Sequence, residues 1–390
     1  MKRWLSVALC LLLLVLPSLT CAASQTEINR QVDSYFTRSK TVGGALVVFQ
    51  DGEIVYQRYY GYQDTSNYAP VTQDTYFRVA SVTKMVSAVG ILQLMEQGLV
   101  DLDEDIGTYF GYEIANTYYP DMPITLRQLM SHTSTVSEKG GYSNGNTIHD
   151  MLSKEIARRG NFTDNRPGSV YAYSNFGAGI VGAILEAVTG VSVNQYMREH
   201  VFDPLGIDAS YDPALLQDTE DITDLFKSDG TRYRSAWGLI RDGYEDFADP
   251  ENHYATTVGK LWIRADDLAK IAIALCGDGT VDGMQLLAPE TVALMRKDPS
   301  TVGVSVLCES PYGLFLERVD TLVEGRTLYG HQGMVAGVLC NVYFDPQTQF
   351  GFVMLTNGCN NVLDNHIGVL ARRQFTYTYQ TFAGAAGPIE

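Results

Sequence analysis

Strand patterns stand at both ends of this 390-residue chain, and helical patterns fill the middle. Residues 45–49 and 54–56 are apolar runs on either side of Asp51-Gly52, a pair typical of a hairpin turn. The other predicted elements are an amphipathic helix at 26–39, helical signals from 85 to about 201, strands at 312–316, 327–329, 337–344 and 351–355, and a helix near 361–373. Strands from both ends that enclose helices predict an α/β (α+β) fold, in which helices flank an antiparallel β-sheet and a mostly helical subdomain is inserted.

A serine precedes a lysine by three residues at one place, Ser81-Val82-Thr83-Lys84, which opens the helical run from Met85 to Gln97. Residues three apart share a helix face, so we expect the Ser81 hydroxyl and the Lys84 amine to touch. Serine is a weak nucleophile until a base takes its proton, and a helix start offers N–H groups to developing negative charge. The pair therefore indicates nucleophilic catalysis. The alternative is a helix-capping serine followed by a solvated lysine.

Two further motifs combine polar side chains with glycine-rich surroundings. Tyr173-Ser174-Asn175 lies where a Pro-Gly turn meets a small-residue helix, and His331-Gln332-Gly333 precedes an apolar, β-branched run. The order serine–lysine, tyrosine–asparagine, basic residue–X–glycine resembles the serine β-lactamase and penicillin-binding protein superfamily. Because Ser-Asp-Asn does not occur, the chain looks like the branch of class C β-lactamases, D-alanyl-D-alanine carboxypeptidases, D-aminopeptidases and esterases.

The resemblance extends beyond these three motifs. Residues 75–84 and 91–98 look like the nucleophile helix of the family, and Leu126 to Ser134 looks like its histidine–threonine–serine segment, with Thr135 where a glycine is usual. Thr356-Asn357-Gly358 matches the segment that closes the C-terminal strand. Similar stretches run from about 43 to about 368, so the resemblance implies a β-lactamase/transpeptidase-like fold with the active site between sheet and helical part.

The resemblance also implies a role for each matching residue. Ser81 would form a covalent acyl-enzyme, assisted by Lys84 and Tyr173, and the backbone N–H groups of Ser81 and Met334 would stabilise the oxyanion. Tyr173 acts either as a phenolate base or as a neutral relay with Lys84 as the base. A free tyrosine has a pKa near 10, and lowering it to about 7 needs roughly 4 kcal/mol, so the first role requires a shielded site facing Lys84.

The resemblance assigns substrate binding to Asn175, His331, Gln332 and Gly333. Asn175 would bond the acyl-side amide of the substrate, or else it caps a helix. His331 replaces a lysine that β-lactamases usually have, and an unperturbed imidazole is mostly neutral near pH 7. Gln332 replaces a hydroxyl residue, which argues against strong carboxylate recognition. The alternative for His331 is a solvated strand histidine, whereas His132 is expected to fill the core beside the site.

The N-terminus predicts export. Lys2 and Arg3, an apolar run from 4 to 16 and small residues before Ala23 are typical of a secretory signal peptide at 1–23. The run is too short to span a bilayer, so we expect a secreted, periplasmic or cell-surface protein without a membrane span. The hydrolase domain would occupy 24–390, with its α/β part at about 24–80 and 255–390 and the helical insertion at about 81–254.

Charge and cysteine content limit the partners. The net charge is −17, and loss of Lys2 and Arg3 makes it −19, which argues against nucleic-acid binding. Cys10 and Cys21 would leave with the signal peptide, although Cys21 leaves a lipoprotein as an alternative. The four other cysteines allow three disulfide connectivities or four free thiols, and their spacing fits no metal cluster: Cys276, Cys308, Cys340 and Cys359.

The sequence therefore predicts an exported serine hydrolase that needs no metal or cofactor and acts on a small molecule or peptide, including cell-wall peptides. D-alanyl-D-alanine carboxypeptidase or D-amino-acid peptide hydrolase activity is the first expectation. The second is a class C-like β-lactamase or carboxylesterase, and the third is a non-catalytic penicillin-binding sensor. The sequence leaves the oligomeric state open. Residues 134–147 and 242–253 are loops by composition. Comparable loops of the family border the substrate groove, so the resemblance makes them candidates for substrate selection, and the alternative is an uninvolved surface loop.

Overall fold

The computed structural model describes residues 24–140, 145–157, 159–243, 246–297, 312–360 and 362–383. The predicted signal peptide, Cys21 and Cys308 lie outside these ranges. The helices are α1 Gln25–Arg38, α2 Val82–Glu96, α3 Gly107–Phe110, α4 Leu126–Met130, α5 Ile148–Leu152, α6 Asn175–Thr189, α7 Val193–Met197, α8 Ala236–Arg241, α9 Thr256–Gly259, α10 Ala265–Cys276, α11 Pro289–Arg296 and α12 Val369–Thr378. The strands are β1 Gly43–Gln50, β2 Glu53–Gly61, β3 Tyr76–Arg78, β4 Leu225–Phe226, β5 Arg232–Arg234, β6 Trp262–Arg264, β7 Thr280–Val281, β8 Met284–Gln285, β9 Glu317–Val319, β10 Leu328–Val335, β11 Val338–Asp345, β12 Phe350–Thr356, β13 Leu363–Asp364 and β14 Ile367–Gly368.

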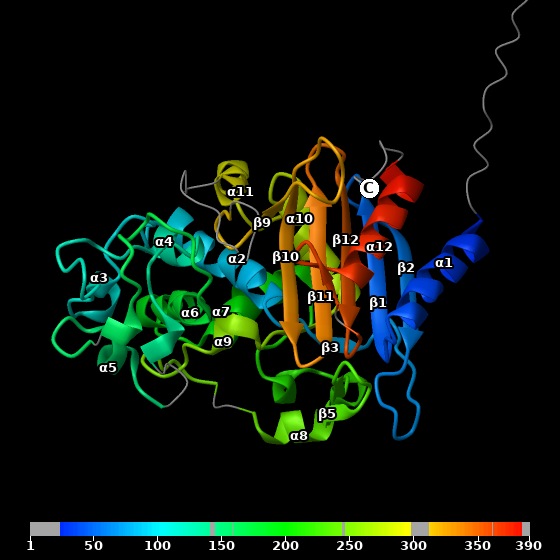
Figure 1. Ribbon diagram of the computed structural model, residues 1–390, viewed down its shortest axis with the longest axis horizontal. Helices are drawn as coiled ribbons and strands as arrows, with labels where there is room; N and C mark the ends of the chain where they lie inside the picture. Colours follow the sequence, from blue (N-terminus) through cyan, green and yellow to red (C-terminus); the bar gives the residue numbers. More distant parts are fainter. Residues whose placement is uncertain are drawn as a thin grey trace, which may run out of the picture.

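The main sheet joins the two ends of the chain. Its strand order is β2-β1-β12-β11-β10-β9, and every neighbouring pair is antiparallel. Strands β1 and β2 come from the beginning of the chain and β9 to β12 from its end, and the described residues between β2 and β9 add no strand to this sheet. Figure 1 shows much of that segment as a mostly helical part next to the sheet. The predicted fold is therefore confirmed: an antiparallel sheet flanked by helices, with helices inserted.

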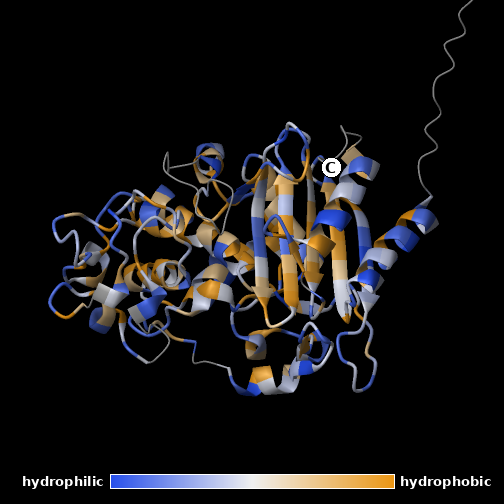
Figure 2. Cartoon of the chain, in the orientation of Figure 1, coloured by the Kyte–Doolittle hydropathy of each residue, from blue (hydrophilic) through white to orange (hydrophobic). Residues whose placement is uncertain are grey.

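Both faces of the sheet are covered, and alternation along β1 explains how. Ala45 and Val47 belong to the large hydrophobic core shared with α2 and α10, whereas Leu46 and Val48 belong to a second core shared with α1 and α12. Successive side chains of a strand point to opposite faces, so a continuously apolar strand serves both cores. Figure 2 shows these hydrophobic residues concentrated in the central strands and in the helices beside them.

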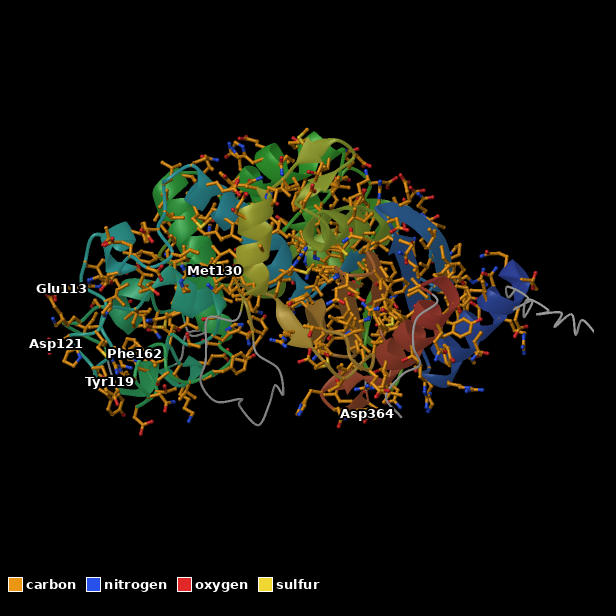
Figure 3. The ribbon with its side chains drawn as sticks, turned by 90° about the horizontal axis from the view of Figure 1, so that it is seen from above. Glu113, Tyr119, Asp121, Met130, Phe162 and Asp364 are labelled. Carbon is orange, nitrogen blue, oxygen red and sulfur yellow. The ribbon has the colours of Figure 1, made fainter. Side chains whose placement is uncertain are left out.

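Helix α2 connects the sheet to the helical part. It contacts β10 and β11 on one side and α6, α7 and α9 on the other, and Val82 to Leu92 are all buried. Figure 3 shows Glu113, Tyr119 and Asp121 at the outer end of the helical part, with Asp364 beside the sheet. The boundaries predicted near 81 and 254 stay predictions.

Among the described residues no single helix is long and apolar enough to span a membrane. Helix α6 and residues 193–205 together have the length and composition of a span, but they are bent by 81° relative to each other.

One predicted element is wrong, and another is displaced along the chain. Residues 312–316 form no strand, because the N–H groups of Leu314 and Phe315 donate to the carbonyls of Met295 and Met130; the edge strand begins at Glu317. The predicted helix at 361–373 begins only at Val369, since β13 and β14 form a hairpin before it. The turn residues of this hairpin, Asn365 and His366, have φ of 45° and 61°. The other predicted strands and the N-terminal helix are confirmed within a few residues.

Candidate active site

Ser81 lies at the start of α2, directly after Ala80, whose φ of 47° makes a sharp turn out of β3. Its side chain makes no helix-capping hydrogen bond, so the capping alternative is wrong. Instead, Lys84 Nζ donates to Ser81 Oγ over 3.1 Å. The hydroxyl and the amine therefore face each other one helical turn apart, as their spacing predicts.

The Lys84 amine is fully buried and held at three positions. Besides Ser81 Oγ, Nζ contacts Asn175 Oδ1 at 3.0 Å and the Val258 carbonyl at 2.7 Å. Burial lowers the pKa of Lys84 to about 7, against the opposing influence of Glu138 and Glu317. No described carboxylate forms an ion pair with this amine, so desolvation dominates.

This geometry prepares the amine to accept a proton. A neutral amine has two N–H donors and one lone pair. The Asn175 and Val258 oxygens can only accept, so they take both N–H groups. The lone pair is then left for the third direction, toward the Ser81 hydroxyl. A neutral Lys84 can therefore serve as general base for Ser81.

Tyr173 packs beside this pair. Lys84 Nζ lies 5.1 Å from the centroid of the Tyr173 ring. On its other side, the imidazole of His132 lies 4.3 Å from the same ring, centroid to centroid. His132 also fixes the backbone on both sides of Tyr173, because its Nδ1 accepts from the Ser174 N–H at 3.2 Å and its carbonyl accepts from the Ala172 N–H at 2.7 Å.

His132 is neutral in this position. Burial and then the nearby Lys84 hold its pKa well below the ordinary value. Since Nδ1 accepts a hydrogen bond, the proton of the neutral ring belongs on Nε2, an atom with no hydrogen-bond partner in the described structure. The prediction that His132 belongs to the core beside the site is confirmed, and the structure adds that it positions Tyr173. Tyr171, buried against the same imidazole, also belongs to this core.

Gly333 lets β10 approach the nucleophile. A Cβ at this position would lie 2.3 Å from the Val79 carbonyl oxygen and 2.9 Å from the Ser81 nitrogen. Real Cβ atoms do not occupy such distances, so only glycine fits. The next residue, Met334, is paired with Leu339 in the sheet and leaves its side chain 39% exposed, which matches a role limited to its backbone. The oxyanion hole at Ser81 and Met334 stays a prediction.

His331 and Gln332 point to opposite sides of β10. His331 is buried, so the solvated alternative is wrong; its Nε2 pairs with the Tyr312 hydroxyl and its Nδ1 with the Gln332 carbonyl at 2.6 Å. Burial, followed by Lys84, lowers the pKa of His331 to about 3, so this ring is neutral. Gln332 Nε2 donates to the His366 carbonyl at 2.7 Å. The structure therefore does not bring the Gln332 side chain to Ser81.

Asn175 is the first residue of α6, and Ser174 is its N-cap, so the capping alternative for Asn175 is wrong. The side-chain oxygen of Asn175 accepts from Lys84, while its backbone N–H donates to Glu138 Oε1 at 2.5 Å. Glu138 is exposed in a short helical turn that contains Glu138–Gly140, within the 134–147 loop. The structure thus adds an acidic group at the edge of the site.

Three residues near Ser81 hold a backbone that side chains disfavour. Ala80, His132 and Thr135 have φ of 47°, 55° and 71°. A β-branched residue at positive φ is a strained outlier, and such strain concentrates at functional sites. Thr135 is held by the Asn116 amide at 2.7 Å and by the Thr163 N–H at 2.8 Å. This explains why a glycine is expected at 135.

Sequence reasoning missed four contributors to the site. Tyr312 stands in the segment 312–316, which the sequence predicts as a plain strand, and Glu317 directly follows it; the Val258 carbonyl carries no sequence signal at all. Glu138 did carry a sequence signal, because it is a carboxylate three residues after Thr135 in the 134–147 loop. Among the described residues, no group of three or more His, Cys, Asp or Glu side chains could hold a metal ion, and three cysteines are buried and free: Cys276, Cys340 and Cys359.

Comparison with known proteins identifies the family of the chain. The Beta-lactamase family profile matches residues 28–372. Penicillin-binding protein 4 of Amycolatopsis lactamdurans is 26% identical over 85% of this chain and 84% of its own. Protein flp of Staphylococcus aureus (strain MW2) is 26% identical over 47% of this chain, a match that covers only 37% of that protein. D-amino acid amidase from Ochrobactrum anthropi SV3 shares the fold, with a TM-score of 0.67 at 23% identity over 91% of this chain and 98% of the amidase. This chain belongs to the Beta-lactamase family.

Proposed function

We propose that the protein is a serine hydrolase that forms an acyl-enzyme on Ser81, with D-amino-acid amides or peptides as its substrates. One observation carries the proposal: a buried amine with a pKa of about 7 lies 3.1 Å from the Ser81 hydroxyl and forms no ion pair with a described carboxylate. A surface lysine would stay protonated at neutral pH and could not take a proton from serine. The burial of Lys84 is therefore what makes the serine a nucleophile.

The reaction would proceed in two steps. Ser81 Oγ attacks the substrate carbonyl while its proton passes to Lys84, and the N–H groups of Ser81 and Met334 receive the oxyanion. Tyr173, which lies against the Lys84 amine, would hand a proton to the leaving group as its bond to the carbonyl carbon breaks, and would regain a proton from Lys84. In the second step water attacks the ester while its proton passes to the neutral amine, and a proton returns to Ser81 Oγ as the ester bond breaks.

The charges around the site favour a substrate with an amino group. His331 is neutral and Gln332 faces His366, so β10 offers no cation to a terminal carboxylate. Glu138 places an exposed carboxylate beside the first residue of α6. At about 4 Å in water, a pair of opposite charges gains about 1 kcal/mol, which corresponds to roughly fivefold in binding. A D-amino-acid amide with a free ammonium group fits this arrangement better than a peptide recognised by its C-terminal carboxylate.

The second candidate is a carboxylesterase on the same residues. The neutral imidazole of His331 favours it, because an uncharged ester needs no cation in the site. A class C-like β-lactamase or a D-alanyl-D-alanine carboxypeptidase has less support, since their substrates carry the carboxylate for which β10 provides no charge. A non-catalytic penicillin-binding sensor has the least support, because the nucleophile and its base are aligned.

A substrate panel tests the proposal. Purified protein is incubated with D- and L-phenylalanine amide, a D-Ala-D-Ala peptide, a chromogenic β-lactam and a p-nitrophenyl ester, alongside the variant Ser81→Ala. We expect turnover of the D-amide above the L-amide, and no turnover by Ser81→Ala. Glu138→Gln should raise KM for the D-amide about fivefold, whereas Glu155→Gln, an exposed carboxylate elsewhere, serves as the matched control. Inert wild-type protein on every substrate would contradict the proposal.

We also propose that residues 1–23 direct export and are then removed, which would bring the enzyme to cell-wall peptides. The basic start and the short apolar run support this. N-terminal sequencing of protein recovered from the cell envelope or the medium tests it: the expected first residue is Ser24 or Ala23, and an intact Met1 on protein retained in the cytoplasm would contradict it.

A further inference from the structure

A second concave site lies beside the nucleophile and is lined with cations. Its volume is about 200 Å³, and its walls come from β3, β6, α8 and the short turn Pro213–Leu215. Three cationic side chains line it, Arg78, Arg234 and Lys260, together with the carboxylates of Asp212 and Asp242. Three positive charges against two negative charges leave an excess of one positive charge among the described lining residues.

The excess charge belongs to Arg78. Its Nε donates to the Gly259 carbonyl at 2.9 Å, but it forms no ion pair with any described residue. Burial lowers the pKa of Arg78, Tyr233 acts in the opposite direction, and the like charge of Arg234 lowers the pKa further. Arg234 has its own partner, Asp242, at 2.5 Å. A guanidinium that is largely buried without a carboxylate carries a desolvation cost that an incoming anion would offset.

Lys260 faces the same pocket and experiences the same repulsion. Burial lowers its pKa, the charge of Arg78 lowers it further, and Asp212 acts in the opposite direction. Two cations that line one small cavity form a field suited to a single anion. The planar fork of Arg78 matches the two oxygens of a carboxylate.

The pocket is connected to the nucleophile by two short segments. Arg78 precedes Ser81 by three residues, at the end of β3. In the other segment, the Val258 carbonyl accepts from Lys84, the Gly259 carbonyl accepts from Arg78, and Lys260 lines the pocket. Gly259 packs on the turn before the nucleophile, because a Cβ there would lie 3.3 Å from the carbonyl carbon of Ala80. A substrate acylating Ser81 therefore has an anion-accepting cavity within reach of its chain.

We propose that this pocket binds a carboxylate that the substrate carries away from its scissile bond. This identification of the ligand as substrate rests on the proposed function; binding of a carboxylate does not. The single excess positive charge and the small volume favour a monoanionic carboxylate over a phosphate dianion.

Titration calorimetry on the full chain tests the proposal. The probes are glutaramate, a monocarboxylate, its neutral isostere glutaramide, and inorganic phosphate. Binding is measured on wild type and on Ser81→Ala, so that loss of hydrolysis leaves the measurement intact. Lys260→Met and Arg78→Gln remove one charge each from the pocket, and Lys297→Met removes one exposed charge outside it as the matched control.

We expect glutaramate to bind wild type and Ser81→Ala saturably, and glutaramide to show no saturable binding. Lys260→Met and Arg78→Gln should each weaken glutaramate binding about tenfold, the loss that accompanies one charge-assisted hydrogen bond. Folding of each variant is checked by circular dichroism, and Lys260→Met decides the matter should Arg78→Gln fail to fold. Equal binding of the amide, equal affinity in Lys260→Met and Lys297→Met, or absence of saturable binding in folded Ser81→Ala would overturn the proposal. Tighter binding of phosphate would overturn the choice of a carboxylate.

Discussion

Replacing Lys84 with methionine removes the base and keeps most of the buried volume. At pH 7 a lysine with its ordinary pKa of 10.5 is only about 0.03% neutral, whereas a pKa of about 7 leaves half of the amine neutral. Burial therefore increases the competent form roughly 1,500-fold. Because general base catalysis contributes roughly 10²- to 10⁴-fold, Lys84→Met should slow acylation of Ser81 by a factor in that range.

The acylation rate is measured by stopped flow as the burst of nitrophenolate from 4-nitrophenyl acetate, between pH 5 and pH 9. For wild type we expect the rate to rise tenfold per pH unit and to level off above an apparent pKa of about 7, since only the neutral amine accepts the proton. Lys84→Met should lose this inflection together with its rate. Lys297→Met, which removes an exposed lysine, should keep the wild-type profile.

Two results would refute this reasoning. A rate that still rises tenfold per pH unit up to pH 9, with no inflection near pH 7, would mean that Lys84 is an ordinary cation and that burial does not prepare it. A burst in Lys84→Met with the wild-type rate and the same inflection would assign the base to another group, with Tyr173 as the first candidate. Urea unfolding of each variant is measured separately, so that a loss of activity is not mistaken for a loss of the fold.

Three further predictions concern groups around the pair. Gly333→Ala should cut the acylation rate more than a hundredfold, because its Cβ meets the Val79 carbonyl at 2.3 Å and forces β10 away from Ser81; a wild-type burst would contradict this. His132→Phe keeps ring packing but leaves the Ser174 N–H without its acceptor, so urea unfolding should show a loss of about 1–3 kcal/mol and stopped flow a slower burst. Glu317 holds its proton to higher pH in the folded chain, because burial raises its pKa from 4.5 to about 7; the stability it contributes is therefore full below pH 4.5 and falls by up to about 3 kcal/mol as the pH rises to 7. Glu317→Gln should unfold like wild type at pH 4.5 and show higher stability than wild type at pH 8, and equal stability at both pH values would contradict the assignment.

Local patterns were sufficient for elements whose own residues determine the backbone. Asp51-Gly52 predicts the β1–β2 turn, and both residues have positive φ, 54° and 83°. The same reasoning failed at 312–316, where an apolar run suggests a strand. There Phe315 turns to a φ of 53° and its N–H donates to Met130, a partner that no local pattern reveals.

For the site, sequence spacing correctly placed Ser81 against Lys84, because both lie on one helix. The family resemblance also selected Asn175, which lies on a distant helix. The sequence could not predict contacts that depend on tertiary packing, namely the Val258 carbonyl that fixes the amine and the side of β10 from which Gln332 emerges. Strand alternation alone predicts that the side chains of Gln332 and His331 point to opposite faces of the sheet. Only the folded structure shows that the Gln332 side chain contacts the His366 carbonyl.

The central claim is that Ser81 is the covalent nucleophile. A fluorophosphonate probe tests this most directly: the labelled protein is cleaved with trypsin and its peptides are analysed by mass spectrometry. Cleavage after Arg78 and Lys84 releases Val79 to Lys84, so the account predicts one probe adduct on this six-residue peptide and none in Ser81→Ala. An adduct on another peptide, or hydrolysis that persists in Ser81→Ala, would contradict the account.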